Sequence, residues 1–242
     1  MPAFFKEIEM FRGDGSNNEK GQSLEEFLDQ YDPYKYKNPC CTVDMAVFAY
    51  SGEVFENMED LKILLIKRRN HPSIGDWAMP GGFVELHESL EEAAQRELYE
   101  ETGVNGICSE QIGTFGDVMR DPRARVITTA YMALVPEKEI KIQAGDDAKE
   151  AEWFRIKTER KKENGMFVFK MVLQNEKTGE KCSPIVTLCE RGRMIRERKF
   201  AIAKRDHVAA DHASIILQAY LILEQRLKER HSEKEKAIHE ME

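Results

Sequence analysis

The sequence has few features of a secreted or disulfide-linked protein. Its five cysteines are odd in number, and no two of them stand at C-x-x-C spacing. A disulfide framework and a zinc site are therefore not expected, and a reducing cytoplasm is the expected location. The first residues also lack the basic start and the long apolar stretch of a secretory signal.

Long apolar runs and an excess of basic charge are missing as well. No run approaches the roughly 20 apolar residues that a membrane-spanning helix needs, so we expect no membrane partner. The 242 residues contain 36 Lys and Arg against 44 Asp and Glu, a net charge of −8. This balance does not favour nucleic acid as a partner, although it is compatible with a local basic patch. With 41% hydrophobic and 33% charged residues, the chain is expected to be globular.

The pattern of residues divides the chain into an arm, a main domain and a tail. Residues 1–38 are expected to form an N-terminal arm in which Ser23 and Glu26 make the capping box of a short helix. The main domain is expected over 39–230, and a charged tail over 231–242. Segments rich in β-branched, aromatic and aliphatic residues predict strands over 42–50, 61–67, 125–135 and 152–156.

Residues 158–204 differ in character from the rest of the main domain. Two apolar stretches, 166–173 and 185–189, flank a polar turn and predict an inserted β-hairpin whose outer flanks are basic. The following segment, 205–230, is expected to end in a helix, because its apolar residues recur at every fourth position and form one core-facing stripe.

A strong helix is predicted over 90–102. Ser89 is a natural N-cap, and Glu92 completes a capping box three residues later. Gly103 stands where a left-handed residue ends a helix. The apolar residues of this segment fall on one side, so the helix is expected to bury one face.

Three glutamates, Glu97, Glu100 and Glu101, share a different face of the same helix, because they stand at i, i+3 and i+4. Carboxylates this close repel one another unless a cation joins them. Mg²⁺ takes oxygen ligands and also bridges phosphates, so a metal site is one interpretation. The other is an ordinary solvated helix face, and the spacing alone does not decide between the two.

The surrounding motif is far more specific than the glutamate spacing. Gly82 is followed after five residues by Glu88 and after seven more by a fixed run. That run is Arg96-Glu97-Leu98-x-Glu100-Glu101-x-Gly103-Val104. At every fixed position this pattern resembles the Nudix box, the signature of the Nudix hydrolases.

The resemblance implies a fold, a metal and a set of roles. The implied fold is α/β: an α/β/α sandwich around a mixed β-sheet, with the box as a loop-helix-loop. The implied metal is Mg²⁺, with Mn²⁺ as the alternative. Arg96 is expected to orient a box glutamate, and Glu88 to support the loop rather than the chemistry. The implied metal ligands are the carbonyl of Gly81 and the carboxylates of Glu97, Glu100 and Glu101.

A wider resemblance, over about residues 24–157 and 205–225, is to ADP-ribose pyrophosphatases and the related Nudix-type regulators of NAD metabolism. It implies hydrolysis of ADP-ribose to AMP and ribose 5-phosphate. Arg123 and Arg125 are candidates to hold the phosphates or the terminal ribose, because guanidinium groups bind phosphate in a bidentate manner. That branch more often has Gly where this chain has Ala124.

The expected mechanism is attack of water on a phosphorus of the pyrophosphate. The resemblance suggests that an acidic residue of the loop before the 152–156 strand activates the water, and Glu150 and Asp147 are the candidates. Glu100 is a rival for the same role, and a plain polar turn is the alternative for the loop.

Two other functions stay open from the sequence. One is an ADP-ribose-sensing transcriptional regulator, in which the basic 158–204 segment would have to contact DNA. The intact box and the short stretch expected after the last helix both disfavour it. The other is a Nudix pyrophosphatase for a different nucleotide. For either enzyme the resemblance implies a small-molecule nucleotide substrate and a homodimer.

Overall fold

The structure is a computed structural model that describes residues 8–35, 37–145 and 148–239. The chain divides into two compact units, Met1–Pro39 and Cys40–Glu242. The smaller unit contains a 3-10 turn, η1 (Glu9–Phe11), and a short helix, α1 (Leu24–Gln30). The capping box predicted for the start of this helix is present, with Ser23 and Glu26 bonded to each other's backbone.

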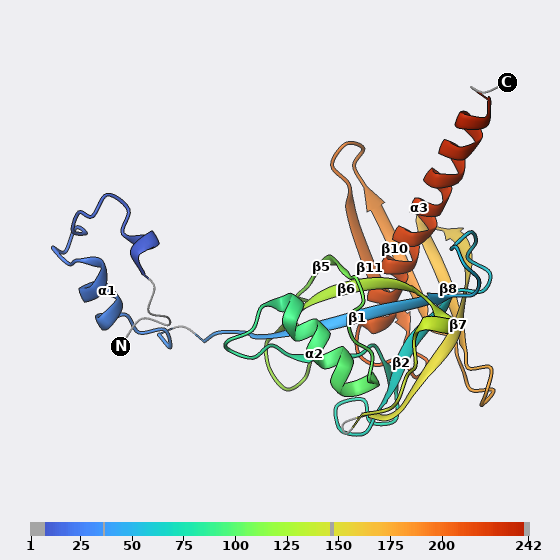
Figure 1. Cartoon of the computed structure of the whole chain (residues 1–242), viewed down its shortest axis with the longest axis horizontal. Helices are drawn as coiled ribbons and strands as arrows, with labels where there is room; N and C mark the ends of the chain where they lie inside the picture. Colours follow the sequence, from blue (N-terminus) through green and yellow to red (C-terminus); the bar gives the residue numbers. More distant parts are fainter. Residues whose placement is uncertain (1–7, 36, 146–147, 240–242) are drawn as a thin grey trace. The chain divides into compact units, whose positions relative to one another are not determined.

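The larger unit is built on one curled β-sheet with a helix on each side (Figure 1). Its helical elements are α2 (Leu90–Thr102), η2 (Glu137–Glu139) and α3 (His212–His239). Its strands among the described residues are β1 (Cys40–Tyr50), β2 (Lys62–Arg68), β3 (Trp77–Ala78), β4 (Gly81–Phe83), β5 (Glu110–Phe115), β6 (Val126–Pro136), β7 (Ala148–Glu163), β8 (Met166–Gln174), β9 (Lys181–Cys182), β10 (Ile185–Arg191) and β11 (Glu197–Lys204).

The sheet is mixed, as the sequence predicted. Its strand order is β11-β10-β8-β7-β2-β1-β6-β5, with β3 beside β2, β4 beside β1 and β9 beside β8. β1 and β6 run parallel, whereas the other named pairs run antiparallel. The α/β class predicted from the sequence is therefore confirmed.

The central strand β1 is buried on both faces, which explains its almost continuous apolar sequence. Val43 and Met45 pack with residues of α2 in one apolar cluster. Ala46 and Phe48 point to the opposite face and join the larger cluster that contains the buried side of α3. The period of two along the strand thus places α2 and α3 on opposite faces of the sheet.

The 158–204 segment does not stand apart as an inserted hairpin. The predicted pairing of its two apolar stretches is present as β8 against β10, but β7 and β11 extend the same ladder on either side. β7 is 16 residues long, whereas the sequence predicted only 152–156. The missed part has a charged sequence, and it is a strand because β8 supplies its hydrogen-bond partner.

The last helix is longer than the sequence predicted. We expected a helix that ends near residue 230 and a charged tail after it, but α3 continues to His239. In the part of the chain that the structure describes, no helix combines the length and the apolar composition of a membrane span.

The capping box of α2 gives a direct test of how this helix is held. Ser89 Oγ accepts the Glu92 N–H at 3.2 Å, and the Glu92 carboxylate accepts the Ser89 N–H at 2.7 Å. Ser89→Ala should lower the free energy of unfolding by about 1 kcal/mol, because one helix N–H loses its partner. A thermal melt should fall by about 2–4 °C for a unit of this size. Ser89→Asp, which can still cap, should melt within 1 °C of the wild type; equal losses in both variants would contradict this role.

Candidate functional site

Residues of the box line a cleft of about 700 Å³. Its walls come from β1, the loop after β2, β4 with its following loop, α2, the 119–123 loop and the start of α3. This volume lies within the range of roughly 300–1,000 Å³ that is usual for small-ligand sites. The sheet and α2 thus bring together segments that are far apart in the sequence.

Arg96 lies at the centre of the carboxylates of α2. Its Nε and Nη2 donate to the two oxygens of Glu88, at 2.9 and 2.7 Å. Its Nη1 donates to Glu97 at 2.7 Å and to Glu100 at 3.0 Å, and Nη2 also reaches the carbonyl of Phe83. The Arg96 side chain lowers the pKa of Glu88 to about 2, together with the Glu85 N–H, so Glu88 stays charged. Arg96 thus contacts both Glu88 and Glu97, while the orienting role of Arg96 and the loop-supporting role of Glu88 stay predictions.

Two glycines let the loop before the box approach the carboxylates. The Gly81 N–H donates to Glu101 at 2.8 Å. A Cβ on Gly81 would lie 2.2 Å from the carbonyl oxygen of Val43, and one on Gly82 would lie 2.4 Å from the Glu97 carboxylate. A side chain at position 81 would push β4 away from β1, whereas one at position 82 would displace the carboxylate of Glu97. Close packing against the backbone therefore requires glycine at position 81.

Glu97 and Glu101 both line the cleft, Glu97 bound to Arg96 and Glu101 bound to the Gly81 N–H. The pKa of Glu101 is raised to about 8. Burial is the largest cause and the nearby Glu97 adds to it, whereas the hydrogen bond from the Gly81 N–H lowers the pKa. Burial also raises the pKa of Glu97, although Arg96 opposes the shift. Two partly buried acids side by side favour a cation between them, since a cation would stabilise both charged forms.

The described side chains do not form a complete metal cage. Among them, no group of three or more His, Cys, Asp or Glu residues is already gathered closely enough to hold an ion. Hard cations such as Mg²⁺ also accept backbone carbonyls and water as ligands, so two carboxylates and a carbonyl fit such an ion. The donor set that fits is Glu97, Glu101 and the carbonyl of Gly81.

The remaining predicted acids lie elsewhere. Glu100 is bound to Arg96, has a side chain that is 54% exposed and does not line the cleft. Glu150 on β7 is directly opposite Lys67 on β2, and its carboxylate lies 3.7 Å from the Lys67 ammonium. Glu150 is not among the residues that line the cleft, so the structure does not bring it to the box glutamates. Asp147 lies outside the described residues.

The two predicted arginines differ in position. Arg123 lines the cleft, where it pairs with Asp121 at 2.8 Å and lies over the ring of Phe83, 5.4 Å from its centre. Arg125 donates to the backbone carbonyls of Gly116, Asp117 and Val126, and it is absent from the cleft wall. Arg125 therefore secures the loop, and only Arg123 faces the ligand space.

Sequence reasoning missed a buried polar network at the floor of the cleft. The Arg120 side chain is only 6% exposed and donates to Asp211 at 3.0 and 3.1 Å and to Asp44 at 3.3 Å. Asp44 also accepts the hydroxyl of Thr128 at 2.7 Å. His212 Nδ1 accepts the Met79 N–H at 2.9 Å, and its Nε2 lies 3.7 Å from Asp44. The only sequence signal was the position of Arg120 three residues before Arg123.

Apart from histidines, the basic side chains that line this cleft are all arginines. Besides Arg96 on α2, five line its walls: Arg68, Arg69, Arg120, Arg123 and Arg205. They come from the end of β2 and the loop after it, the 119–123 loop and the segment before α3, and they line a space that Glu97 and Glu101 also line. A ligand with several phosphate charges fits a cleft that is lined by arginines and by two glutamates, because guanidinium groups bind phosphate.

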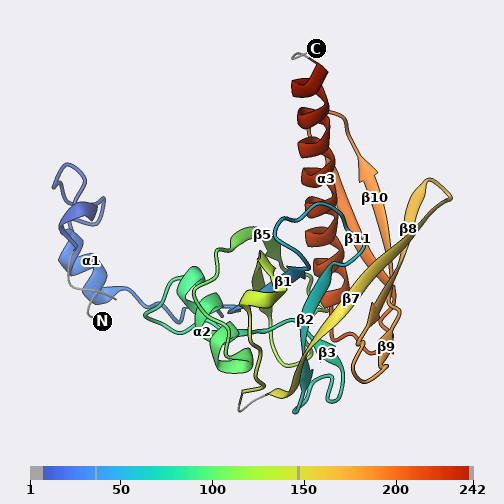
Figure 2. The same ribbon diagram turned by 45° about the vertical axis from the view of Figure 1, so that its right-hand side comes forward.

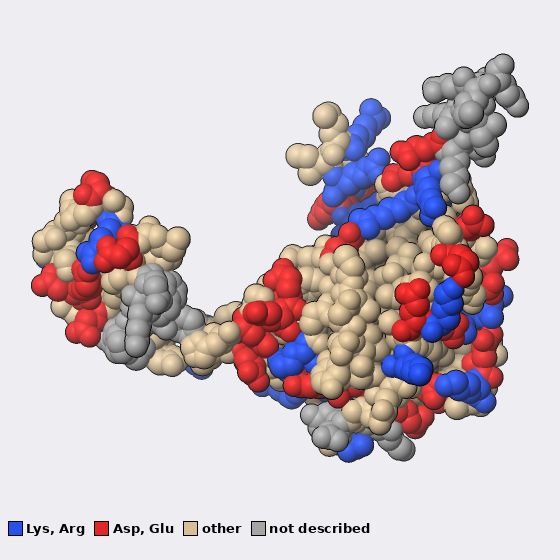
Figure 3. Space-filling model, in the orientation of Figure 1, with Lys and Arg blue, Asp and Glu red and all other residues tan. Residues whose placement is uncertain are grey.

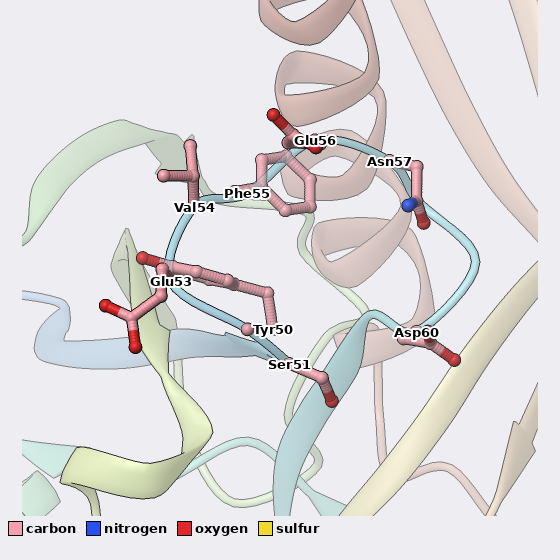
Figure 4. A pocket seen from close by; sticks show the side chains of 9 residues that line it. Tyr50, Ser51, Glu53, Val54, Phe55, Glu56, Asn57 and Asp60 are labelled. Atoms are coloured by element: carbon pink, nitrogen blue, oxygen red, sulfur yellow. The ribbon is translucent and has the colours of Figure 1, made fainter.

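A second hollow, of about 350 Å³, lies under the loop that joins β1 and β2 (Figure 4). Its walls include Glu53, Glu56 and Asp60 but no lysine or arginine among the residues that line it. A phosphate-bearing ligand is therefore not expected there, and the box cleft is the candidate active site.

Comparisons with known proteins match the part of the chain that contains the box. Residues 52–172, half of the chain, match the NUDIX domain family. The ADPR responsive transcriptional repressor NtrR of Acinetobacter baylyi is 38% identical over 136 residues, which are 55% of this chain and 52% of that protein. The ADP-ribose pyrophosphatase of Methanocaldococcus jannaschii is 50% identical over 98 residues, which are 40% of this chain and 57% of that protein.

A solved structure extends the similarity beyond the matched domain. The crystal structure of a MutT/nudix family protein from Enterococcus faecalis has a TM-score of 0.59 and 31% sequence identity to this chain. The similarity covers 91% of this chain and 75% of that one. By contrast, the chain spans little more than half the length of the repressor and the pyrophosphatase.

The raised pKa of Glu101 predicts a pH dependence of stability in the absence of divalent cations. The folded protein holds this proton up to a pH of about 8, whereas the unfolded chain releases it near the ordinary value of 4.5. Stability from this group is therefore present at low pH and is lost as the pH rises toward 8. In EDTA, the melting temperature of the wild type should fall between pH 5.5 and 8.5 more steeply than that of Glu101→Gln.

Glu100→Gln is the matched control, because it removes a neighbouring acid of α2 and leaves Glu101 in place. Its melting temperature should fall with pH as steeply as that of the wild type. Parallel curves for the wild type and Glu101→Gln would show that Glu101 does not take up a proton on folding.

Proposed function

Because the chain belongs to the NUDIX domain family, we propose that it hydrolyses a nucleoside diphosphate linked to another moiety, with ADP-ribose as the substrate. One observation carries the proposal: Glu97 and Glu101 face a set of arginines across a single cleft. The carboxylates suit a divalent cation, and the guanidinium groups suit phosphates. Together they form a site for a pyrophosphate.

ADP-ribose is favoured among such substrates by two similarities. One relative is named an ADP-ribose pyrophosphatase, and another is named an ADPR responsive repressor. Phe83, which lines the cleft and lies under Arg123, offers an aromatic surface on which an adenine ring can stack. The cleft of about 700 Å³ is large enough for a molecule of this size.

Glu97, Glu101 and the Gly81 carbonyl are the groups that would hold the divalent cation, which when bound would neutralise phosphate charge and favour attack by water. Arg96 keeps Glu97 in position through its 2.7 Å bond, and the Gly81 N–H keeps Glu101 in position. Glu100, bound to the same Arg96 but outside the cleft wall, is a candidate to accept the proton of the attacking water only if its side chain rotates toward the cleft.

Arg120 is the arginine best suited to anchor a phosphate. Asp44 and Asp211 hold its guanidinium from two sides, so it has little freedom to lose when a ligand binds. Arg123 is more exposed and already bound to Asp121, so it fits a contact at the rim of the cleft. The two arginines would thus hold the pyrophosphate and the group beyond it.

The proposal is tested by the release of AMP and ribose 5-phosphate from ADP-ribose with Mg²⁺, beside NADH, dinucleoside polyphosphates, sugar nucleotides and nucleoside triphosphates. We expect ADP-ribose to give the highest kcat/KM. Glu101→Gln should lower kcat by at least 100-fold, because it removes a metal-binding charge, while a far-ultraviolet spectrum shows an intact fold. A higher kcat/KM for another compound would make that compound the substrate instead of ADP-ribose. Near wild-type turnover by Glu101→Gln would show that Glu101 does not hold a catalytic metal ion.

The role of Arg120 predicts a different kinetic effect. Arg120→Lys keeps the charge but loses the planar fork, so we expect KM for ADP-ribose to rise at least tenfold with a smaller change in kcat. Arg125→Gln is the control, since Arg125 donates to the backbone carbonyls of Gly116, Asp117 and Val126 and does not line the cleft, and its KM should stay within twofold of the wild type. Equal effects of both substitutions would assign Arg120 a structural role only.

The choice between Mg²⁺ and Mn²⁺, the homodimer and the cytoplasmic location stay predictions. Each has a simple measurement: turnover with either ion after chelation, light scattering behind a sizing column, and fractionation of cells. They are independent of the choice of substrate.

A further inference from the structure

Charge is strongly segregated along this chain. Residues 155–205 contain 15 Lys and Arg against 6 Asp and Glu, a local net charge of +9. The whole chain carries −8, so all other residues together carry −17. A separation of this size orients the protein toward an anionic surface and gives it one preferred direction of approach.

Eight of these 15 basic residues lie at one end of the sheet, beside Glu159, Glu163, Glu190 and Glu197. β8 and β10 pair with Phe167 opposite Leu188 and Lys170 opposite Ile185. The turn between β7 and β8 therefore lies at the same end as the turn between β10 and β11 (Figure 2). We call this region the hairpin end; its basic residues are Arg160, Lys161, Lys162, Arg191, Arg193, Arg196, Arg198 and Lys199.

The hairpin end is remote from the candidate active site. The first residue of β7, Ala148, pairs with Arg68 of the cleft wall, whereas the last, Glu163, is at the hairpin end. A strand of 16 residues spans about 50 Å at roughly 3.3 Å per residue. The hairpin end is therefore not explained by binding of the substrate in the cleft.

Two apolar side chains stand at the turn between β10 and β11. Met194 is 100% exposed and Ile195 is 91% exposed. The turn that presents them has a defined shape: Gly192 has a φ of +86°, and a Cβ there would lie 2.0 Å from the carbonyl oxygen of Ile195. Arginines flank the pair on both strands, and Lys and Arg cover this hairpin in the space-filling view (Figure 3).

We propose that the β10–β11 hairpin docks this protein on an anionic lipid surface. Apolar side chains at the turn suit the boundary between headgroups and acyl chains, and the arginines behind them suit the lipid phosphates. Nucleic acid is the competing alternative, because the same arginines suit its phosphates, and the vesicle and duplex probes below decide between the two. The docking is peripheral, so it needs no membrane-spanning helix, and it does not depend on the proposed hydrolysis.

The test is sedimentation of the full chain with vesicles of phosphatidylcholine alone or with 30% phosphatidylserine, at 50 and 300 mM salt. We expect binding to the anionic vesicles at least tenfold tighter than to neutral ones, and weaker binding at high salt because surface charges are screened. No preference for anionic vesicles would overturn the proposal.

Two variants separate the charged and apolar contributions. The triple variant Arg191→Gln, Arg193→Gln, Arg196→Gln should weaken binding to anionic vesicles at least tenfold. A control with the same loss of charge, Lys177→Gln, Lys181→Gln, Lys204→Gln, lies at the opposite end of β8 and β11 and should weaken binding less than threefold.

The double variant Met194→Ser, Ile195→Ser should weaken binding at least threefold. Equal losses in the triple variant and its control, or no effect of the double variant, would contradict docking through this hairpin.

A labelled DNA duplex of 30 base pairs is the competing probe. Binding of the duplex tighter than that of the anionic vesicles, and lost in the triple variant, would make the hairpin a nucleic-acid surface and overturn the proposal. Rates of ADP-ribose hydrolysis in solution should stay within twofold of the wild type in every hairpin variant. Lipid binding and hydrolysis can therefore fail separately.

Discussion

The candidate active site depends on one guanidinium group. Arg96 holds Glu88, Glu97 and Glu100, and it also binds the carbonyl of Phe83. Three acids on or beside one helix would otherwise repel one another and splay apart. Because Arg96 is planar and donates in fixed directions, it fixes where each carboxylate lies as well as offsetting its charge. The loop before α2, the helix and the cleft wall are thereby joined at one residue.

Glu101 is the acid that Arg96 does not reach, and it has the most strongly raised pKa of the described box glutamates. Its hydrogen bond comes from the Gly81 backbone, which can approach only because residues 81 and 82 have no side chain. The fold therefore keeps a largely buried acid, bonded to a backbone N–H rather than to an arginine, at the proposed cation site. Under that proposal, affinity for a cation and stability of the cation-free protein oppose each other.

The sequence predicted well those features that are set by residues close together in the chain, such as the ends of α2. The bounds of α2 follow from Ser89, Glu92 and Gly103, and all three caps are present in the structure. The Arg96 contacts were also accessible, since they follow from helical spacing and the box motif. The Arg120 network was not, because Asp44 and Asp211 lie 76 and 91 residues from Arg120 and meet it only when β1, a loop and α3 are assembled. Likewise, β7 is extended by its neighbour β8 rather than by its own charged sequence.

β7 connects the two regions of the molecule that carry most of its chemistry. Near its start it pairs with the β2 residues that border the cleft, and near its end it enters the basic hairpin end. In a continuous sheet, the added strands β8, β10 and β11 leave the β1–β2–β6 core and its box undisturbed. A basic surface can thus be added without changing the acidic surroundings of the box. The sheet keeps the two regions apart by the length of a strand. Positive charge on the hairpins therefore does not compete with Arg96 or with a cation for the box carboxylates, since screening is nearly complete over that distance.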